Sequence, residues 1–341
     1  MIEQSGATAS RKPPTLYDVA ALADVSHQTV SRLVKGHTNI HPDIRVRVEA
    51  AIAELRYRPN LVARSLATAT SRRIGVLFFD RLDQVGPTRS VQEASDRARE
   101  AGYFLDIIGL ASQVESEIER AIAAVDRVDV AGIMVFAPTS AVREAIKRAS
   151  FPVPVFIDFD PLGPSKPVMA NIKGTQLLIQ HLAELGHQRF FTITGPTGWD
   201  AAQVRLQAYV DAVAATGGVS VGECEGDWGA QSGYDAILRM PLDAGITAVV
   251  AANDQMALGA IKACETRGIR VPEDLSVVGF DNVTESLFFK PALTTIGFDF
   301  GLQGRIAMEE LLQMIDPNFA VAAESVLEPR LILRASTAHV T

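Results

Sequence analysis

The segment from Leu16 to Leu66 constrains the fold most, because its first apolar residues repeat at a helical spacing that is interrupted only once. Thr15 with Asp18 three residues later is typical of a capping box, and Ser26 can cap a second helix. Two short helices bury little apolar surface by themselves, so a third helix is needed. The segment Pro42–Leu55 supplies it, with an inner stripe of Ile44, Val48, Ala51, Ile52 and Leu55. The sequence therefore predicts an N-terminal all-α head of the helix-turn-helix type.

The exposed face of the second predicted helix is polar and suited to contact DNA. It carries His27, Gln28, Thr29, Ser31 and Arg32. A glutamine can pair with adenine and an arginine with guanine, and a recognition helix presents its first turns to base edges in the major groove. Any one of these residues could equally belong to an ordinary polar helix face. The whole set, placed after a short turn and a capped start, favours DNA contact.

Charge is divided unevenly along the chain and supports the same interpretation. Residues 1–73 contain 11 Lys and Arg against 6 Asp and Glu, a net charge of +5. The rest of the chain contains 21 against 34, a net charge of −13, and the whole chain carries −8. A basic head on an acidic body fits phosphate attraction that is confined to one end of the molecule.

The string YRPNLVARSLA, which follows the head, predicts a short and marginally stable helix. Asn60 can cap a helix that runs to Ala67, and a helix of two turns forms only when it packs on a partner or on DNA. Leu66 then has two interpretations: it wedges between base steps in the minor groove, or it packs on the body. Spacing alone leaves these two interpretations equal.

Alternating apolar runs and helical patterns predict two parallel α/β lobes in the rest of the chain. In the first lobe the expected strands are 74–80, 104–110, 131–138 and 153–158, and expected helices include 91–101 and 115–125. In the second lobe strands are expected at 189–195, 248–254 and 275–281, with helices at 203–215 and from 255. Ligands collect at the carboxyl ends of such strands, where this chain has Asp158, Asn253 and Asp281.

No pattern in the chain predicts an enzyme, a catalytic residue, a metal site or a cofactor site. There is no GxGxxG after a strand, no P-loop and no HExxH, and the six histidines lack ligand spacing. The two cysteines, Cys224 and Cys264, fit a reduced cytoplasmic protein. No secretory signal or membrane-spanning stretch is expected, which disfavours a sugar-binding or sugar-processing protein without a DNA role. Residues 1–14 are expected to form a disordered leader.

Several strings together resemble the LacI/GalR family of transcription regulators, from Leu16 to about Arg334. They are LYDVAALADVSHQTVSRLV, YRPNLVARSLA, EGDW, ANDQMALGAI, DLSVVGFDN and PALTTI. The resemblance implies a homodimer whose paired heads bind a pseudo-palindromic operator in double-stranded DNA, with Leu66 intercalated in the minor groove. The DNA-binding residues that it implies are Leu16, Tyr17, Ser26, His27, Gln28, Thr29, Ser31, Arg32, Asn60, Ala63, Arg64 and Leu66. The C-terminus lacks tetramer-forming leucine heptads, so a dimer is expected.

The resemblance also implies a division of the chain. The DNA-binding head covers 15–58, a hinge helix and linker cover 59–73, and an effector-binding and dimerisation domain covers 74–341. This domain is expected to have the two-lobed fold of type I periplasmic binding proteins. Its N-lobe covers about 74–170 and 299–326, and its C-lobe covers about 171–298 and 327–336.

Ten residues are implied to bind an effector between the lobes. Five match positions that hold a sugar in family members, namely Asp158, Arg205, Trp228, Asn253 and Asp281, and Phe300 keeps an aromatic position of the wall. Carboxylates and an arginine bind vicinal hydroxyls, and an indole packs on the C–H face of a pyranose. Taken singly, the same residues could be helix caps, core or surface. The chain departs from the family pattern at Asp83, Arg89, Phe136 and Phe298, which puts a galactoside in doubt.

The expected function is a sequence-specific repressor of carbohydrate-metabolism genes that a mono- or disaccharide releases from its operator. Ligand in the cleft would favour one lobe angle over another by its differential affinity. A cytoplasmic regulator that answers to a nucleoside or purine is the alternative.

Overall fold

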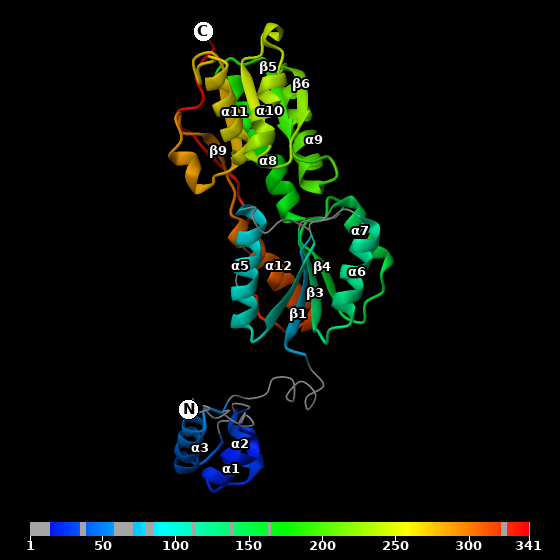
Figure 1. The fold of residues 1–341 in the computed structure, drawn as a ribbon, viewed down its shortest axis with the longest axis vertical. Coiled ribbons are helices and arrows are strands. Elements are labelled where there is room, and N and C mark those ends of the chain that lie inside the picture. Colours follow the sequence, from blue (N-terminus) through cyan, green and yellow to red (C-terminus); the bar gives the residue numbers. More distant parts are fainter. Residues whose placement is uncertain are drawn as a thin grey trace, which may run out of the picture. The chain divides into compact units, whose positions relative to one another are not determined.

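A computed structural model describes residues 14–34, 39–57, 71–78, 85–110, 114–136, 139–162, 165–321 and 326–340. The chain divides into two compact units, residues 1–70 and residues 71–341 (Figure 1). Some predictions lie outside the described residues and stay predictions. These are the leader, nearly all of the hinge and the site residues Asn60, Ala63, Arg64, Leu66 and Asp83.

The first unit contains the predicted three-helix head. Its helices are α1 (Leu16–Leu22), α2 (His27–Val34) and α3 (Pro42–Glu54). The capping box is confirmed, because Thr15 Oγ1 accepts from the backbone N–H of Asp18 and the Asp18 carboxylate accepts from the N–H of Thr15. Ser26 Oγ accepts from the N–H of Thr29 at 3.2 Å, which confirms the second cap. The centre of the head is formed by the buried side chains Val19, Val30 and Val48.

The second unit begins with a four-stranded parallel sheet in the order β2-β1-β3-β4. Its strands are β1 (Arg73–Phe78), β2 (Phe104–Gly109), β3 (Gly132–Phe136) and β4 (Val155–Ile157). Three helices connect them: α5 (Val85–Glu100), α6 (Glu115–Asp126) and α7 (Ser140–Arg148). The predicted strands of this lobe are confirmed, with shifts of a few residues at their ends.

Both faces of this first sheet are buried, as the continuous apolar run of β1 predicts. Ile74, Val76 and Phe78 pack towards α5 and towards α12 (Phe300–Ile315). Leu77 points to the opposite face, where α6 and α7 pack. The helix α12 thus belongs to the first lobe although it lies between β9 (Thr294–Gly297) and β10 (Arg330–Ile332), two strands of the second lobe, in sequence.

The second lobe is built on a six-stranded sheet in the order β10-β9-β8-β7-β5-β6. Its strands are β5 (Arg189–Thr194), β6 (Val219–Glu225), β7 (Ala248–Ala251), β8 (Ser276–Asp281), β9 (Thr294–Gly297) and β10 (Arg330–Ile332). Only the edge strand β10 is antiparallel to its neighbour among the described pairs, which departs from the purely parallel sheet that was expected.

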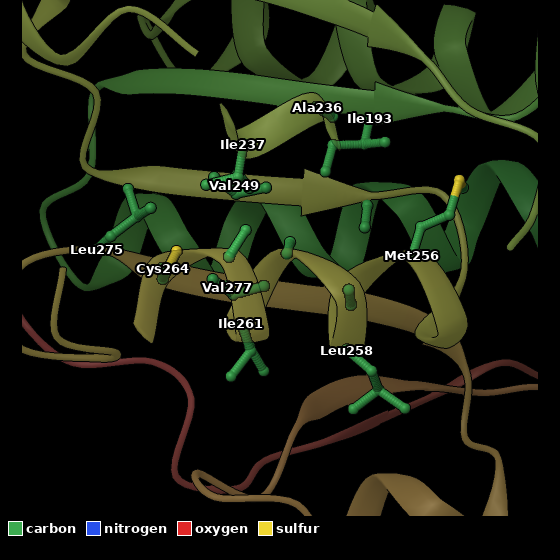
Figure 2. Packing of buried hydrophobic residues seen from close by; sticks show 14 of the residues in the cluster. Ile193, Ala236, Ile237, Val249, Met256, Leu258, Ile261, Cys264, Leu275 and Val277 are labelled. Atoms are coloured by element: carbon green, nitrogen blue, oxygen red, sulfur yellow. The ribbon is translucent and has the colours of Figure 1, made fainter. Parts of the chain in front are cut away.

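Helices cover both faces of the second sheet. They are α8 (Lys166–Glu184), α9 (Asp200–Ala215), α10 (Ala230–Arg239) and α11 (Asp254–Thr266), with short 3₁₀ helices at Leu242–Ala244 and Thr284–Leu287. One face packs on α10 and α11, where Ile193, Val249 and Val277 meet Ile237 and Ile261 (Figure 2). The chain passes between the lobes after β4, after β9 and after α12.

Several elements were not predicted, and two helices begin earlier than expected. The sequence patterns did not indicate α8, α10, β6, β9, β10 or α12. Helix α5 begins at Val85 rather than 91, and α9 begins at Asp200 rather than 203. The early turns matter because they bring Gly86, Pro87 and Ala201 to the cavity described below. Among the described residues, no helix is both long and apolar enough to cross a membrane.

Candidate functional sites: a DNA-binding head and a cleft

The predicted DNA-contacting residues of the head gather on its surface. Ser26, His27, Gln28 and Arg32 are exposed, and Thr29 and Ser31 are partly exposed. Tyr17, which is 68% exposed on α1, places its ring 5.2 Å from the ring of His27 on α2. Arg32 Nη2 donates to the carbonyl of Asn39 at 3.3 Å, a bond that a DNA base could replace. Leu16 differs from the rest, because it packs against the head core.

The second unit contains a cavity of about 110 Å³ between its two lobes. Seven of the predicted effector residues line it: Phe136, Asp158, Arg205, Trp228, Asn253, Asp281 and Phe300. They come from elements that are far apart in sequence. Phe136, Asp158 and Asp281, for example, lie at the carboxyl ends of β3, β4 and β8. This is the edge at which parallel α/β sheets bind ligands. The roles of these residues as ligand contacts stay predictions.

Arg205 is the most heavily contacted polar residue of the cavity wall. Its Nε donates to Asn171 Oδ1 at 2.6 Å, its Nη1 donates to the carbonyl of Ala252, and its Nη2 donates to Asp281 Oδ1 at 3.4 Å. The guanidinium carbon lies 3.8 Å from the centre of the Phe280 ring. Burial lowers the pKa of Arg205, and the charge of Asp281 opposes this shift. These contacts therefore hold the guanidinium group of Arg205 in one orientation before any ligand binds.

Asn253 and Trp228 form a second fixed part of the wall. Asn253 caps α11, since its Oδ1 accepts from the N–H of Met256 at 2.9 Å, and its Nδ2 donates to the carbonyl of Trp228 at 2.9 Å. Trp228 has a φ of 67°, a left-handed conformation that costs a non-glycine residue about 1–2 kcal/mol. A Cβ at Gly195 would lie 2.2 Å from the indole, so only glycine fits beneath the ring.

Two carboxyl groups in the cavity are strongly affected by burial. Desolvation raises the pKa of Asp158 from 3.8 to about 7, although Gln303 Nε2 donates to its Oδ2 at 2.5 Å and this bond lowers the pKa. Desolvation also raises the pKa of Asp281 to about 7, against the attraction of Arg205. Strongly shifted pKa values of buried groups in a cavity are concentrated at functional sites.

Two predicted effector residues, Arg89 and Phe298, are not among the residues that line this cavity, and their role as ligand contacts stays a prediction. Both line an adjoining groove that shares Asp281 and Phe300 with the cavity. Arg89 lies on α5 next to Ser90, which does line the cavity, but its exposed side chain is not part of the cavity wall. The ring of Phe298 is buried between Phe280 and Phe300, at centroid distances of 6.0 and 4.7 Å.

The sequence reasoning missed several polar and aromatic residues of the cavity wall. These are Ser90, Asn171, Trp199, Gln255 and Gln303. Gln255 Oε1 is buried and has no hydrogen-bond partner among the described residues. Gln255 follows Asn253 at a helix start, and Gln303 lies one turn after Phe300, so both could have been found from their neighbours. Asn171 could not, because α8 itself was not predicted.

Comparison with known proteins agrees with this division of the molecule. Residues 15–60 match the family described as bacterial regulatory proteins, lacI family, and residues 179–337 match a periplasmic binding protein-like domain. The chain is 38% identical over 335 residues to the lactose operon repressor of Escherichia coli (strain K12), which covers 96% of this chain and 91% of that protein.

Two solved structures extend the similarity to the fold. A lac repressor dimer bound to operator and the anti-inducer ONPF has a TM-score of 0.84 and 34% identity, covering 96% of this chain and 100% of that one. A complex of the transcriptional regulator CelR with cellobiose has a TM-score of 0.68 and 30% identity, covering 95% and 99%. The chain therefore belongs to the lacI family of bacterial regulatory proteins.

Proposed function

We propose that this protein is a transcriptional repressor that binds an operator through its head and is released when a sugar occupies the cleft. One observation carries the proposal: the same chain joins a helix-turn-helix head to a cavity whose wall holds two carboxyls, a guanidinium and an indole. The first part recognises DNA and the second fits a polyhydroxylated ring. The relatives are regulators, which supports a binding role for the cleft rather than catalysis.

The chemistry of the cavity supports a sugar. Carboxyl oxygens of Asp158 and Asp281 can accept hydrogen bonds from hydroxyl groups, and Arg205 can donate from a fixed fork. The indole of Trp228 offers a flat apolar surface for the C–H face of a pyranose. A relative of known structure binds cellobiose, which shows that the shared fold accommodates a sugar in that protein.

The head supports operator binding by a homodimer. Residues His27, Gln28 and Arg32 project from the first turns of α2, where a recognition helix meets base edges. The lac repressor in the operator complex is a dimer, and a dimer binds two half-sites related by a two-fold axis. A pseudo-palindromic operator follows for this chain.

A nucleoside or purine is the second candidate effector, and one feature favours it. Phe136, Phe300, Trp199 and Trp228 all line the cavity, so more than one aromatic surface is available to stack on a base. The two carboxyl groups of the cavity argue against a nucleoside or purine. Asp158 already accepts a hydrogen bond from Gln303, and Asp281 accepts one from Arg205. A sugar offers these carboxyls more hydroxyl donors than a base does.

A ligand screen tests the proposal directly. The chain has two tryptophans, and both line the cavity, so intrinsic fluorescence reports on this site alone. Full-length protein is titrated with monosaccharides, disaccharides and nucleosides, and melting temperature is recorded in parallel because a ligand of the native state raises it. A sugar that changes fluorescence and raises the melting temperature supports the proposal. A response to nucleosides alone would replace the sugar, and no response to either class would overturn the assignment of the cleft.

A further inference from the structure

A buried ion pair joins the two lobes outside the residues proposed to hold the effector. Arg143 lies on α7 of the first lobe and Asp200 is the first residue of α9 in the second lobe. Arg143 Nη1 donates to Asp200 Oδ2. The side chains are nearly inaccessible, at 6% and 1% exposure. We name Arg143 and Asp200 the interlobe pair.

The interlobe pair is poorly suited to act as a source of stability. Arg143 Nε and Asp200 Oδ1 are buried without a hydrogen-bond partner among the described residues. The nearest further carboxylate, Asp160, lies 3.8 Å from Arg143 Nε. Removing two ions from water costs free energy that an incompletely bonded pair recovers only in part. If one partner is removed, the other remains as an uncompensated buried charge, which water can hydrate only when the lobes separate.

The interlobe pair is directly connected to the cavity wall. Trp199 precedes Asp200 and Ala201 follows it, and both of these neighbours line the cavity. Trp199 also forms an isolated antiparallel β-bridge with Thr139, the residue that caps α7. Its indole contacts that of Trp228 edge to face, with ring centres 6.5 Å apart. A displacement of Asp200 would therefore move Trp199 away from Trp228.

We propose that Arg143 is a positioning residue for the cavity: through Asp200 it holds Trp199 against Trp228 and keeps the two lobes in register. It touches no proposed ligand contact itself. The proposal concerns the unliganded protein, so it holds whether the effector is a sugar or a nucleoside.

Acrylamide quenching of Trp199 fluorescence tests the proposal without any effector. In the full-length Trp228→Phe protein, Trp199 is the remaining tryptophan, because the chain has two. Arg143→Met preserves most of the side-chain volume and removes the charge, and Asp200→Asn removes the charge from the other partner. Both changes are expected to raise the quenching constant of Trp199 roughly twofold, as the population of separated lobes grows.

A matched variant on the same helix provides the control. Arg148 forms an exposed ion pair with Glu115 at 3.3 Å within the first lobe, so Arg148→Met should leave the quenching constant unchanged. The double change Arg143→Met with Asp200→Asn should resemble either single change, because each already breaks the pair. Far-ultraviolet circular dichroism identifies folded variants, and Arg143→Gln, which also removes the charge, is used if Arg143→Met does not fold. Unchanged quenching in two folded variants of the pair, or an equal rise in Arg148→Met, would overturn the proposal.

Discussion

The two walls of the cleft are built differently. The second-lobe wall consists of polar side chains held by one another: Arg205 bonds to Asn171 and Asp281, and Asn253 bonds to the backbone of Trp228. The first-lobe wall consists mainly of apolar groups, namely Val85, Pro87, Phe136 and Phe159, with Asp158 as its buried carboxyl. The difference indicates that the second lobe orients a polar ligand while the first lobe encloses it.

The largest effect on the free energy of unfolding is expected from removing the side chain of Arg205 from the second-lobe wall. Arg205→Ala leaves Asp281 buried without its cation and uncovers the Phe280 ring. Loss of one partner of a buried pair costs about 3–5 kcal/mol, so the free energy of unfolding should fall by that amount. Urea unfolding measures it. The control is Arg270→Ala, which removes an exposed pair with Asp274 and should cost far less, because solvent screens exposed ion pairs. Equal losses in the two variants would contradict the fixed second-lobe wall.

In the first-lobe wall, Asp158→Asn is expected to raise the free energy of unfolding, by less than Arg205→Ala lowers it. Burial raises the pKa of Asp158 to about 7 from 3.8, so the folded protein keeps this proton over a range in which the unfolded chain loses it. Stability from this group is present below pH 4 and is lost as the pH rises through 7. Asp158→Asn removes the ionisation and still accepts from Gln303.

The stability advantage of Asp158→Asn over the wild type should therefore grow with pH. Between pH 5 and pH 8 it should increase by about 3 kcal/mol, because two pH units lie between pH 5 and the folded pKa of about 7 and each corresponds to about 1.4 kcal/mol. Urea unfolding at both pH values, wild type against variant, measures the difference. The wild type also contains Asp281 with a raised pKa, which is common to both proteins and cancels in the comparison. An advantage that is constant or shrinks with pH would show that Asp158 is not desolvated.

The smallest effect is expected from removing the hydrogen bond between Gln303 and Asp158. Gln303 Nε2 supplies the hydrogen bond that lowers the pKa of Asp158, so Gln303→Leu should raise this pKa further. The expected stability change at pH 5 is below about 1 kcal/mol, because the carboxyl is then mostly protonated. The pH at which the decline in stability levels off should move upward relative to the wild type, while the pH at which it begins stays the same. A downward movement would mean that Gln303 does not donate to the carboxylate.

The head could be predicted closely because its determinants are local. The capping box of Thr15 and Asp18, the Ser26 cap and the apolar spacing of α3 all act within a few residues. The strands that carry Phe136, Asp158 and Asp281 were also accessible, since continuous apolar runs followed by polar residues mark buried parallel strands.

The rest of the cleft depends on contacts that are distant in sequence. Asn171 comes from α8, and Gln303 comes from α12, which returns to the first lobe after five of the six strands of the second sheet. Phe298 and Phe300 are two residues apart, yet one ring is buried beside Phe280 and the other lines the cavity. Packing decides which of these two neighbouring aromatic rings faces a ligand. Their spacing in the sequence alone did not show which one it would be.

The central claim is that occupation of the cleft controls the head, and operator binding measured with and without sugar tests it most directly. Fluorescence anisotropy of a labelled pseudo-palindromic duplex, selected from a random library, is recorded with a sugar that raises the melting temperature. We predict that the sugar weakens operator affinity by about 5–150-fold in the wild type, the usual range for such coupling. In Asp158→Asn the same sugar concentration should have no effect, although the variant binds the operator normally. A sugar that binds the cavity and leaves operator affinity unchanged, or an undiminished release in Asp158→Asn, would contradict the account.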